Sequence, residues 1–218
     1  MARQSDNGTM QAELLPLFPL SVVLLPHNEL PLHIFEERYK EMIRASLDSK
    51  TGFGVVLASA SGIAGAGCTA HIEQVLKEYP DGRLDILTFG RLRFTISGLD
   101  EEKAYLRATV DYFGDDDFTA PLELRQKALE VCSQIPEPEM LSGQRHLSSE
   151  DDGLSFLLAQ RIADAQLRQQ LLVSRSETGR LQKLIEYAPG YASSRRQAEH
   201  VKQVAGQNGH GRKPPSLP

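Results

Sequence analysis

The sequence predicts an α+β protein in which a strand-rich N-terminal half is followed by a helix-rich C-terminal half. In the first half apolar residues alternate with polar ones, which is the period of a strand with one buried face. In the second half they recur every three or four residues, which is typical of amphipathic helices. The acidic run at residues 114–117 marks the join between the two halves.

The chain opens with apolar segments that are interrupted by prolines. Residues 14–18 and 30–35 are predicted to be short strands, restricted to sheet edges, strand ends or bulges because proline gives the ladder no N–H. Apolar residues spaced three or four apart then predict a helix over 36–47. The continuous apolar segment 53–58 is predicted to be a buried strand.

The next part of the chain predicts further strands. Residues 70–79 fit a helical stripe as well as an alternating strand, so periodicity leaves their structure open. A turn is predicted at 80–82, where proline and glycine suit the required backbone angles. Alternation on either side of Gly90 then predicts two strands within 83–96, and residues 105–112 predict another.

The second half predicts four helices and a division into two subdomains. The first helix is predicted to begin at Pro121 and to end before Pro136. Proline suits the first position of a helix because an N–H there would have no partner within the helix. Three more are predicted over 153–162, 164–172 and 177–187.

We therefore assign a β-rich subdomain to residues 14–116 and a helical subdomain to residues 117–190. The polar segment 1–13 and the basic segment 191–218 lack apolar periodicity, so both are predicted to be disordered tails.

Composition narrows the classes of partner. A net charge of -5 and a pI near 5.7 provide no basic field for phosphates, so nucleic acid is not favoured. Cys68 and Cys132 are too few for a disulfide framework, and no segment approaches the roughly 18 apolar residues of a membrane span. The N-terminus has no apolar core of a secretory peptide. We expect a cytoplasmic protein that does not enter membranes.

No motif in the sequence predicts catalysis or a cofactor. Residues 62–69 have the glycine spacing of a phosphate-binding loop, but Cys68 stands where that loop needs lysine. The same glycines match a dinucleotide motif without its βαβ setting, so a flexible glycine loop between two strands is predicted instead. The six histidines show no metal-ligand spacing, and no serine lies in a hydrolase motif. We assign no catalytic, cofactor or metal residue and predict a protein that is not an enzyme.

The proline-punctuated segment resembles the opening of the N-terminal substrate-binding domain of Lon-type ATP-dependent proteases. The matching residues are Leu-Pro-Leu-Phe-Pro-Leu at 15–20 and Leu-Pro-Leu-x-Ile-Phe-Glu-x-Arg-Tyr at 30–39. Cys68 departs from the family, which more often has Gly-Thr directly. Further matches follow in the family's order at 53–56, 67–72, 80–83, 90–94, 169–172 and 180–184.

The resemblance covers residues 14–187 and implies a specific fold. It implies a twisted, PUA-like β pseudo-barrel with one inserted helix, followed by a helical bundle, and it favours a strand over 70–79. The ATPase and Ser-Lys protease modules of a full Lon protease have no counterpart in these residues, so no hydrolase activity follows. The chain looks like a stand-alone Lon substrate-binding domain protein.

The resemblance implies a non-catalytic module that binds other polypeptides, with a role in protein quality control or regulation. Clients would be unfolded or regulatory segments. The alternative is binding of a small ligand or RNA, because PUA-like barrels elsewhere bind RNA. Exposed apolar contacts are predicted in a loop and beside the acidic join, although the same residues would also suit a core. They are Leu24, Leu25, Pro26, Phe113 and Phe118.

Overall fold

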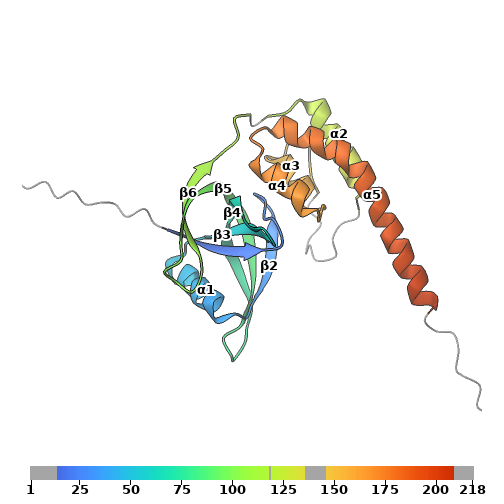
Figure 1. Cartoon of the computed structure of the whole chain (residues 1–218). Coiled ribbons are helices and arrows are strands. Elements are labelled where there is room, and N and C mark those ends of the chain that lie inside the picture. Colours follow the sequence, from blue (N-terminus) through green and yellow to red (C-terminus); the bar gives the residue numbers. More distant parts are fainter. Residues whose placement is uncertain (1–13, 118, 136–145, 209–218) are drawn as a thin grey trace, which may run out of the picture. The chain divides into compact units, whose positions relative to one another are not determined.

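The computed structural model describes residues 14–117, 119–135 and 146–208 of the 218-residue chain (Figure 1). Its strands are β1 (Leu15–Leu20), β2 (Glu29–Ile34), β3 (Phe53–Ser59), β4 (Gly62–Glu78), β5 (Leu84–Asp100) and β6 (Arg107–Phe113). Its helices are α1 (Glu37–Ser49), α2 (Leu122–Ser133), α3 (Leu154–Ala159), α4 (Ala165–Val173) and α5 (Glu177–Asn208).

Backbone proximity divides these elements into two compact units. Unit 1 holds residues 14–115 together with 164–175, and unit 2 holds the described residues within 116–163 and 176–208. The sequence predicted a contiguous helical subdomain over 117–190, and the structure differs because α4 belongs with the strands.

The strands of unit 1 form a closed barrel with one added strand. The sheet order is β2-β5-β4-β3-β1-β6. Because β5 also pairs with β6, the strands from β5 to β6 close into a barrel, and β2 is the added strand. The pair β1–β3 is parallel and the others are antiparallel. The predicted α+β fold with a pseudo-barrel is confirmed.

The barrel interior is packed around Phe94 of β5. Gly67 lies against it, since a Cβ built on Gly67 would stand 2.6 Å from the Phe94 ring and 2.5 Å from the carbonyl oxygen of Val55. No side chain fits there, so glycine is required by packing and not by a ligand. The core cluster consists of Leu15, Leu17, Val56, Phe94 and Ala108.

The glycine segment 62–67 is therefore part of a strand, and its prediction as a flexible loop was wrong. The turn lies earlier, at Ala60 and Ser61, and Gly62 has a positive φ of 115° as β4 begins. Residues 54–59 pair with residues 62–69 across this turn. The ambiguous segment 70–79 is a strand, as the resemblance implied.

Two strands around Gly90 were predicted within 83–96, but residues 84–96 belong to the single seventeen-residue strand β5. Gly90 marks a close approach of two backbones instead of a turn. A Cβ at this position would stand 2.2 Å from the carbonyl oxygen of Leu25. The Gly90 N–H donates to the carbonyl of Asn28, which fixes the 21–28 loop against β5.

Three polar side chains attach α4 to the barrel. Arg93 of β5 donates to the carbonyl oxygens of Leu172 and Ser174 at 3.0 and 2.5 Å. From α4, Arg168 donates to the carbonyl of Val23, and Gln169 donates to that of Ala66. Each bond joins residues far apart in the sequence, which explains why residues 164–175 belong to unit 1.

The basic tail predicted over 191–218 is partly wrong, because α5 continues to Asn208. The helix passes Pro189 and keeps an anchored face in unit 2. Ala188 and Ala192 are fully buried, and the Tyr191 hydroxyl accepts a hydrogen bond from the Ala163 N–H at 3.0 Å. Small apolar residues gave too weak a periodic pattern to predict this helix. The predicted tail over 1–13 and residues 209–218 lie outside the described residues.

Unit 2 contains a buried ion pair. Arg180 and Glu177, both on α5, are 1% exposed, and the Arg180 guanidinium lies 2.8 Å from the Glu177 carboxylate. Ser155 of α3 donates to Glu177 through its hydroxyl at 2.6 Å and through its N–H at 2.9 Å. The guanidinium also lies 4.1 Å from the Phe156 ring centroid. Removing one partner leaves a charge without compensation in the interior.

We predict that Arg180→Met lowers the free energy of unfolding of unit 2 by about 3–5 kcal/mol, because Glu177 then stays buried without its cation. Urea denaturation followed by circular dichroism measures the loss. The matched control is Arg44→Met in the exposed pair with Glu78, which is expected to cost less than about 1 kcal/mol. Equal losses in the two variants would contradict the assignment.

Candidate functional site

Three of the predicted binding residues lie in the core. Leu24 and Leu25 are 2% and 0% exposed, and Pro26 is buried beside them. The loop that carries them lies against Gly90, as described above. In this structure they offer no surface to a partner, which is the core interpretation that the sequence had left open. Phe118 lies outside the described residues.

Phe113, the remaining predicted residue, is half-buried at the end of β6. The Arg93 and Arg175 guanidinium carbons lie 4.7 and 5.9 Å from its ring centroid. Arg93 is itself buried and forms an ion pair of 2.5 Å with Asp115. The Phe113 ring thus covers a cation that holds α4, which is a structural role.

The cysteines have no features of nucleophiles. Both are buried and neither forms a disulfide. Burial raises the pKa of the Cys68 thiol to about 12 and that of Cys132 to about 11, so both stay protonated at neutral pH. Among the described residues, no three His, Cys, Asp or Glu side chains converge on a possible metal position.

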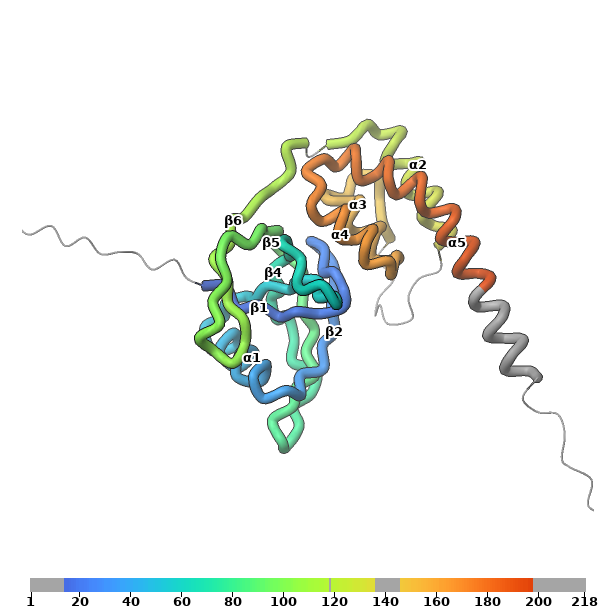
Figure 2. Tube along the Cα trace, in the orientation of Figure 1, coloured from blue at the N-terminus to red at the C-terminus, as the bar shows by residue number. Residues whose placement is uncertain are grey.

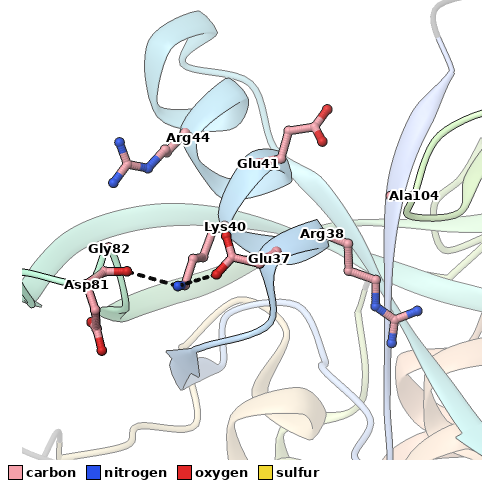
Figure 3. Close-up of a pocket in the computed structure, with 8 residues that line it drawn as sticks. All are labelled: Glu37, Arg38, Lys40, Glu41, Arg44, Asp81, Gly82 and Ala104. Carbon is pink, nitrogen blue, oxygen red and sulfur yellow. Dashed lines mark hydrogen bonds and ion pairs between the residues drawn. The ribbon is translucent and has the colours of Figure 1, made fainter.

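A pocket of about 480 Å³ lies in unit 1 beside the first turns of α1 (Figure 3). The Lys40 ammonium lies between the Glu37 carboxylate at 2.8 Å and the Asp81 carbonyl oxygen at 3.0 Å. The other two cations at the pocket also have acidic partners, Arg38 with Glu36 and Arg44 with Glu78. Positive and negative charges balance, so the pocket provides no net field for an anion. Its lining is Glu37, Arg38, Lys40, Glu41, Arg44, Asp81, Gly82 and Ala104.

A second candidate is the outward face of the three-stranded sheet β2-β5-β4, which we call the open face. Along β5, Leu84, Ile86 and Thr88 are buried, whereas the alternate residues are partly exposed. The ladder places residues of β2 and β4 beside each of these alternate positions. The open face consists of Pro31, His33, Gln74, Lys77, Asp85, Leu87 and Phe89, with Phe35 just beyond the end of β2.

Phe35 is the most exposed aromatic side chain of this face, at 59%. It stacks on the His33 ring with centroids 5.9 Å apart and an interplanar angle of 23°. His33 is in turn held by Asp85 at 2.5 Å, and the Tyr79 hydroxyl donates to the other oxygen of Asp85 at 2.8 Å. The hydrogen-bonded His33 therefore holds the exposed Phe35 ring in place.

Cations lie over the remaining rings near the open face. Lys77 and Arg83 lie 4.4 and 4.7 Å from the Tyr79 ring centroid. Arg91 lies 5.0 Å from the Phe89 centroid and forms an ion pair with Glu73 at 2.8 Å. The aliphatic parts of these side chains extend the apolar surface, while their charges are balanced by neighbouring acids.

The comparisons with known proteins assign the family. The model of the ATP-dependent protease La (LON) substrate-binding domain matches residues 14–188. The chain belongs to this family. The match begins at the edge of the described barrel and extends into α5, so it includes both units of the LON substrate-binding domain.

Solved structures of Lon N-terminal domains support this assignment. A Lon N-terminal domain protein from Xanthomonas campestris shares 26% identity with a TM-score of 0.65, over 81% of this chain and 99% of that chain. The N-terminal domain of a Mycobacterium avium complex Lon protease shares 18% identity with a TM-score of 0.58, over 81% and 98%. At 18% identity, the second similarity shows only a shared fold. Within the described residues, the helices include none that is long and apolar enough to cross a membrane.

The open face was not predicted from the sequence, although part of its signal is present there. Leu84, Ile86 and Thr88 alternate with residues that point to the other face, but alternation does not reveal that the second face stays uncovered. Phe35 was included in the predicted strand 30–35, whereas it lies just beyond the end of β2. Only the register of β2, β5 and β4 brings these side chains together.

We predict that His33→Val raises the pKa of the Asp85 carboxyl toward its ordinary value. In the folded protein the hydrogen bonds from His33 and Tyr79 hold this pKa below that value. A lowered folded pKa contributes stability above the unfolded pKa, and this contribution is lost as the pH falls through the folded pKa. As the pH is lowered, the variant should therefore lose the Asp85 contribution to folding stability at a higher pH than the wild type does.

Carboxyl-carbon NMR titration measures the Asp85 pKa directly. Asp81 serves as the internal control, because a backbone hydrogen bond from Arg83 lowers its pKa and His33 makes no contact there. An unchanged Asp85 pKa in His33→Val, or equal changes at both aspartates, would contradict the assigned cause.

Proposed function

We propose that the protein is a non-catalytic, cytoplasmic polypeptide-binding protein whose open face receives exposed segments of client polypeptides. Its role would lie in protein quality control or regulation. The family model, which describes a substrate-binding domain, supports the general role. The observation that supports this particular surface is Phe35, an aromatic ring that is 59% exposed and held in place by His33.

The composition of the open face suits an unfolded segment. Phe35, Leu87, Phe89 and Pro31 supply a partly exposed apolar stripe, and an unfolded client exposes apolar side chains of its own. Burying both surfaces provides the main driving force. His33 and Gln74 lie beside the stripe and offer hydrogen-bonding groups at its rim.

Proline limits how a client engages this surface. The outer edge of β2 pairs with no other strand of the described residues, but Pro31 in its middle has no N–H to give. A client strand added at this edge would meet an interrupted ladder. We therefore propose that recognition uses side chains across the face.

The structure offers less support for the alternative, binding of a small ligand or RNA. It rested on the RNA binding of other PUA-like barrels and on the glycine segment 62–67, and that segment forms a paired strand packed on Phe94. The charges around the open face are balanced, which provides no electrostatic attraction for a nucleic-acid backbone.

We predict that Phe35→Ser weakens client binding by at least about tenfold, as expected when a central aromatic contact is removed. Fluorescence anisotropy with a labelled, reduced and alkylated polypeptide measures the dissociation constant. The matched control is Leu99→Ser, which removes an apolar side chain 52% exposed in unit 1 but outside the open face.

Thermal denaturation checks that both variants keep the wild-type fold. Equal affinities of the two variants would contradict the assignment of the open face. Failure of the wild-type protein to bind any unfolded polypeptide would contradict the proposed function itself.

A further inference from the structure

The second half of β4 has an uncovered backbone edge. β3 pairs with β4 as far as Ala70, and beyond it β4 continues to Glu78 with β5 on one side. On the other side, the described part of the chain supplies no strand. Figure 2 shows the β4–β5 hairpin extending past the rest of unit 1. Along residues 71–78, the peptide groups that point away from β5 are therefore available to another strand.

This edge carries apolar side chains at its centre. Residues 73–78 are all exposed, and among them Val75 and Leu76 are 40% and 52% exposed. They are the only large apolar side chains in that segment, and charged residues lie on both sides of them. A short apolar centre between charges is typical of a surface that meets a matching surface of limited size.

The flanking charges have opposite signs and lie on one face. Glu73 pairs with Arg91, whose guanidinium lies over the Phe89 ring of the open face. Lys77 lies opposite Asp85, another residue of that face. Glu73 and Lys77 thus lie on the same side of the strand, two residues before and two residues after Val75.

We propose that this edge pairs with the same edge of a second copy of the protein, antiparallel and with the two-fold axis at Val75. In that register Glu73 of each copy lies opposite Lys77 of the other, and the two Val75 residues face each other. Opposite charges at directly facing positions stabilise an antiparallel pair. The interface is isologous, as in most homodimers, so both ion pairs form at once.

The same charges exclude the parallel arrangement. An in-register parallel pair would place Glu73 opposite Glu73 and Lys77 opposite Lys77, which is unfavourable. β4 also has bulges between Ile72 and Gln74 and between Val75 and Lys77. Bulges and an edge lysine discourage pairing with unrelated strands, so the edge is selective for a complementary one.

The contact between the two edges is small. Two edges of eight residues bury less than the roughly 1,600 Å² of a standard stable interface. We therefore expect a reversible dimer that forms in the micromolar range and dissociates on dilution.

The test uses charge reversal and sedimentation velocity on the full chain. Glu73→Lys and Lys77→Glu each place like charges opposite one another in a homodimer, so each variant alone should dimerise at least about tenfold more weakly than the wild type. An equimolar mixture of the two should dimerise again, because every facing pair then has opposite signs. The double variant should also dimerise.

Three results would overturn the proposal: a wild-type protein that stays monomeric across the micromolar range, single variants that dimerise like the wild type, or a mixture that stays monomeric. Glu73 and Lys77 are both exposed, and thermal denaturation checks that the variants are folded. Phe35→Ser should dimerise like the wild type, so the failure of this proposal is distinguishable from failure of client binding.

Discussion

The unequal length of the strands determines most of what unit 1 presents to its surroundings. β4 and β5 each have seventeen residues, whereas the other strands have six or seven. One half of β5 closes the barrel with β6, and the other half, paired with β2 and β4, extends beyond it. The extension creates both an uncovered sheet face and an uncovered edge. A shorter β5 would close the same barrel without either surface.

The barrel wall also explains how one helix from the second half of the sequence becomes part of unit 1. Arg93 is a buried cation on β5, and its hydrogen bonds go to carbonyl groups at the end of α4 and to Asp115. The last carbonyls of a helix have no N–H donor further along that helix, and here one guanidinium donates to the helix end while it belongs to the strand. Gly90, three residues earlier, lets the 21–28 loop approach β5 closely. The residues that first looked like a binding loop are consequently interior.

Local sequence patterns predicted most elements, because alternation and three-to-four spacing report a buried face directly. They failed where the decisive fact was long-range. Gly90 and the glycines at 62–67 were interpreted through their freedom to turn, whereas close packing against Leu25 and Phe94 is what requires them. The assignment of α4 to the strands depends on Arg93 and Arg168, whose partners are far away in sequence. The open face could not be predicted, since its exposure depends on which face the helices leave uncovered.

Client binding, as proposed, requires that client segments contact the open face. The most direct measurement is an NMR titration of the isotope-labelled protein with a reduced and alkylated polypeptide, following backbone amide and side-chain shifts. The largest changes are expected at His33, Phe35, Leu87 and Phe89. Changes confined to the pocket beside α1, or to the vicinity of Phe113, would contradict the proposal.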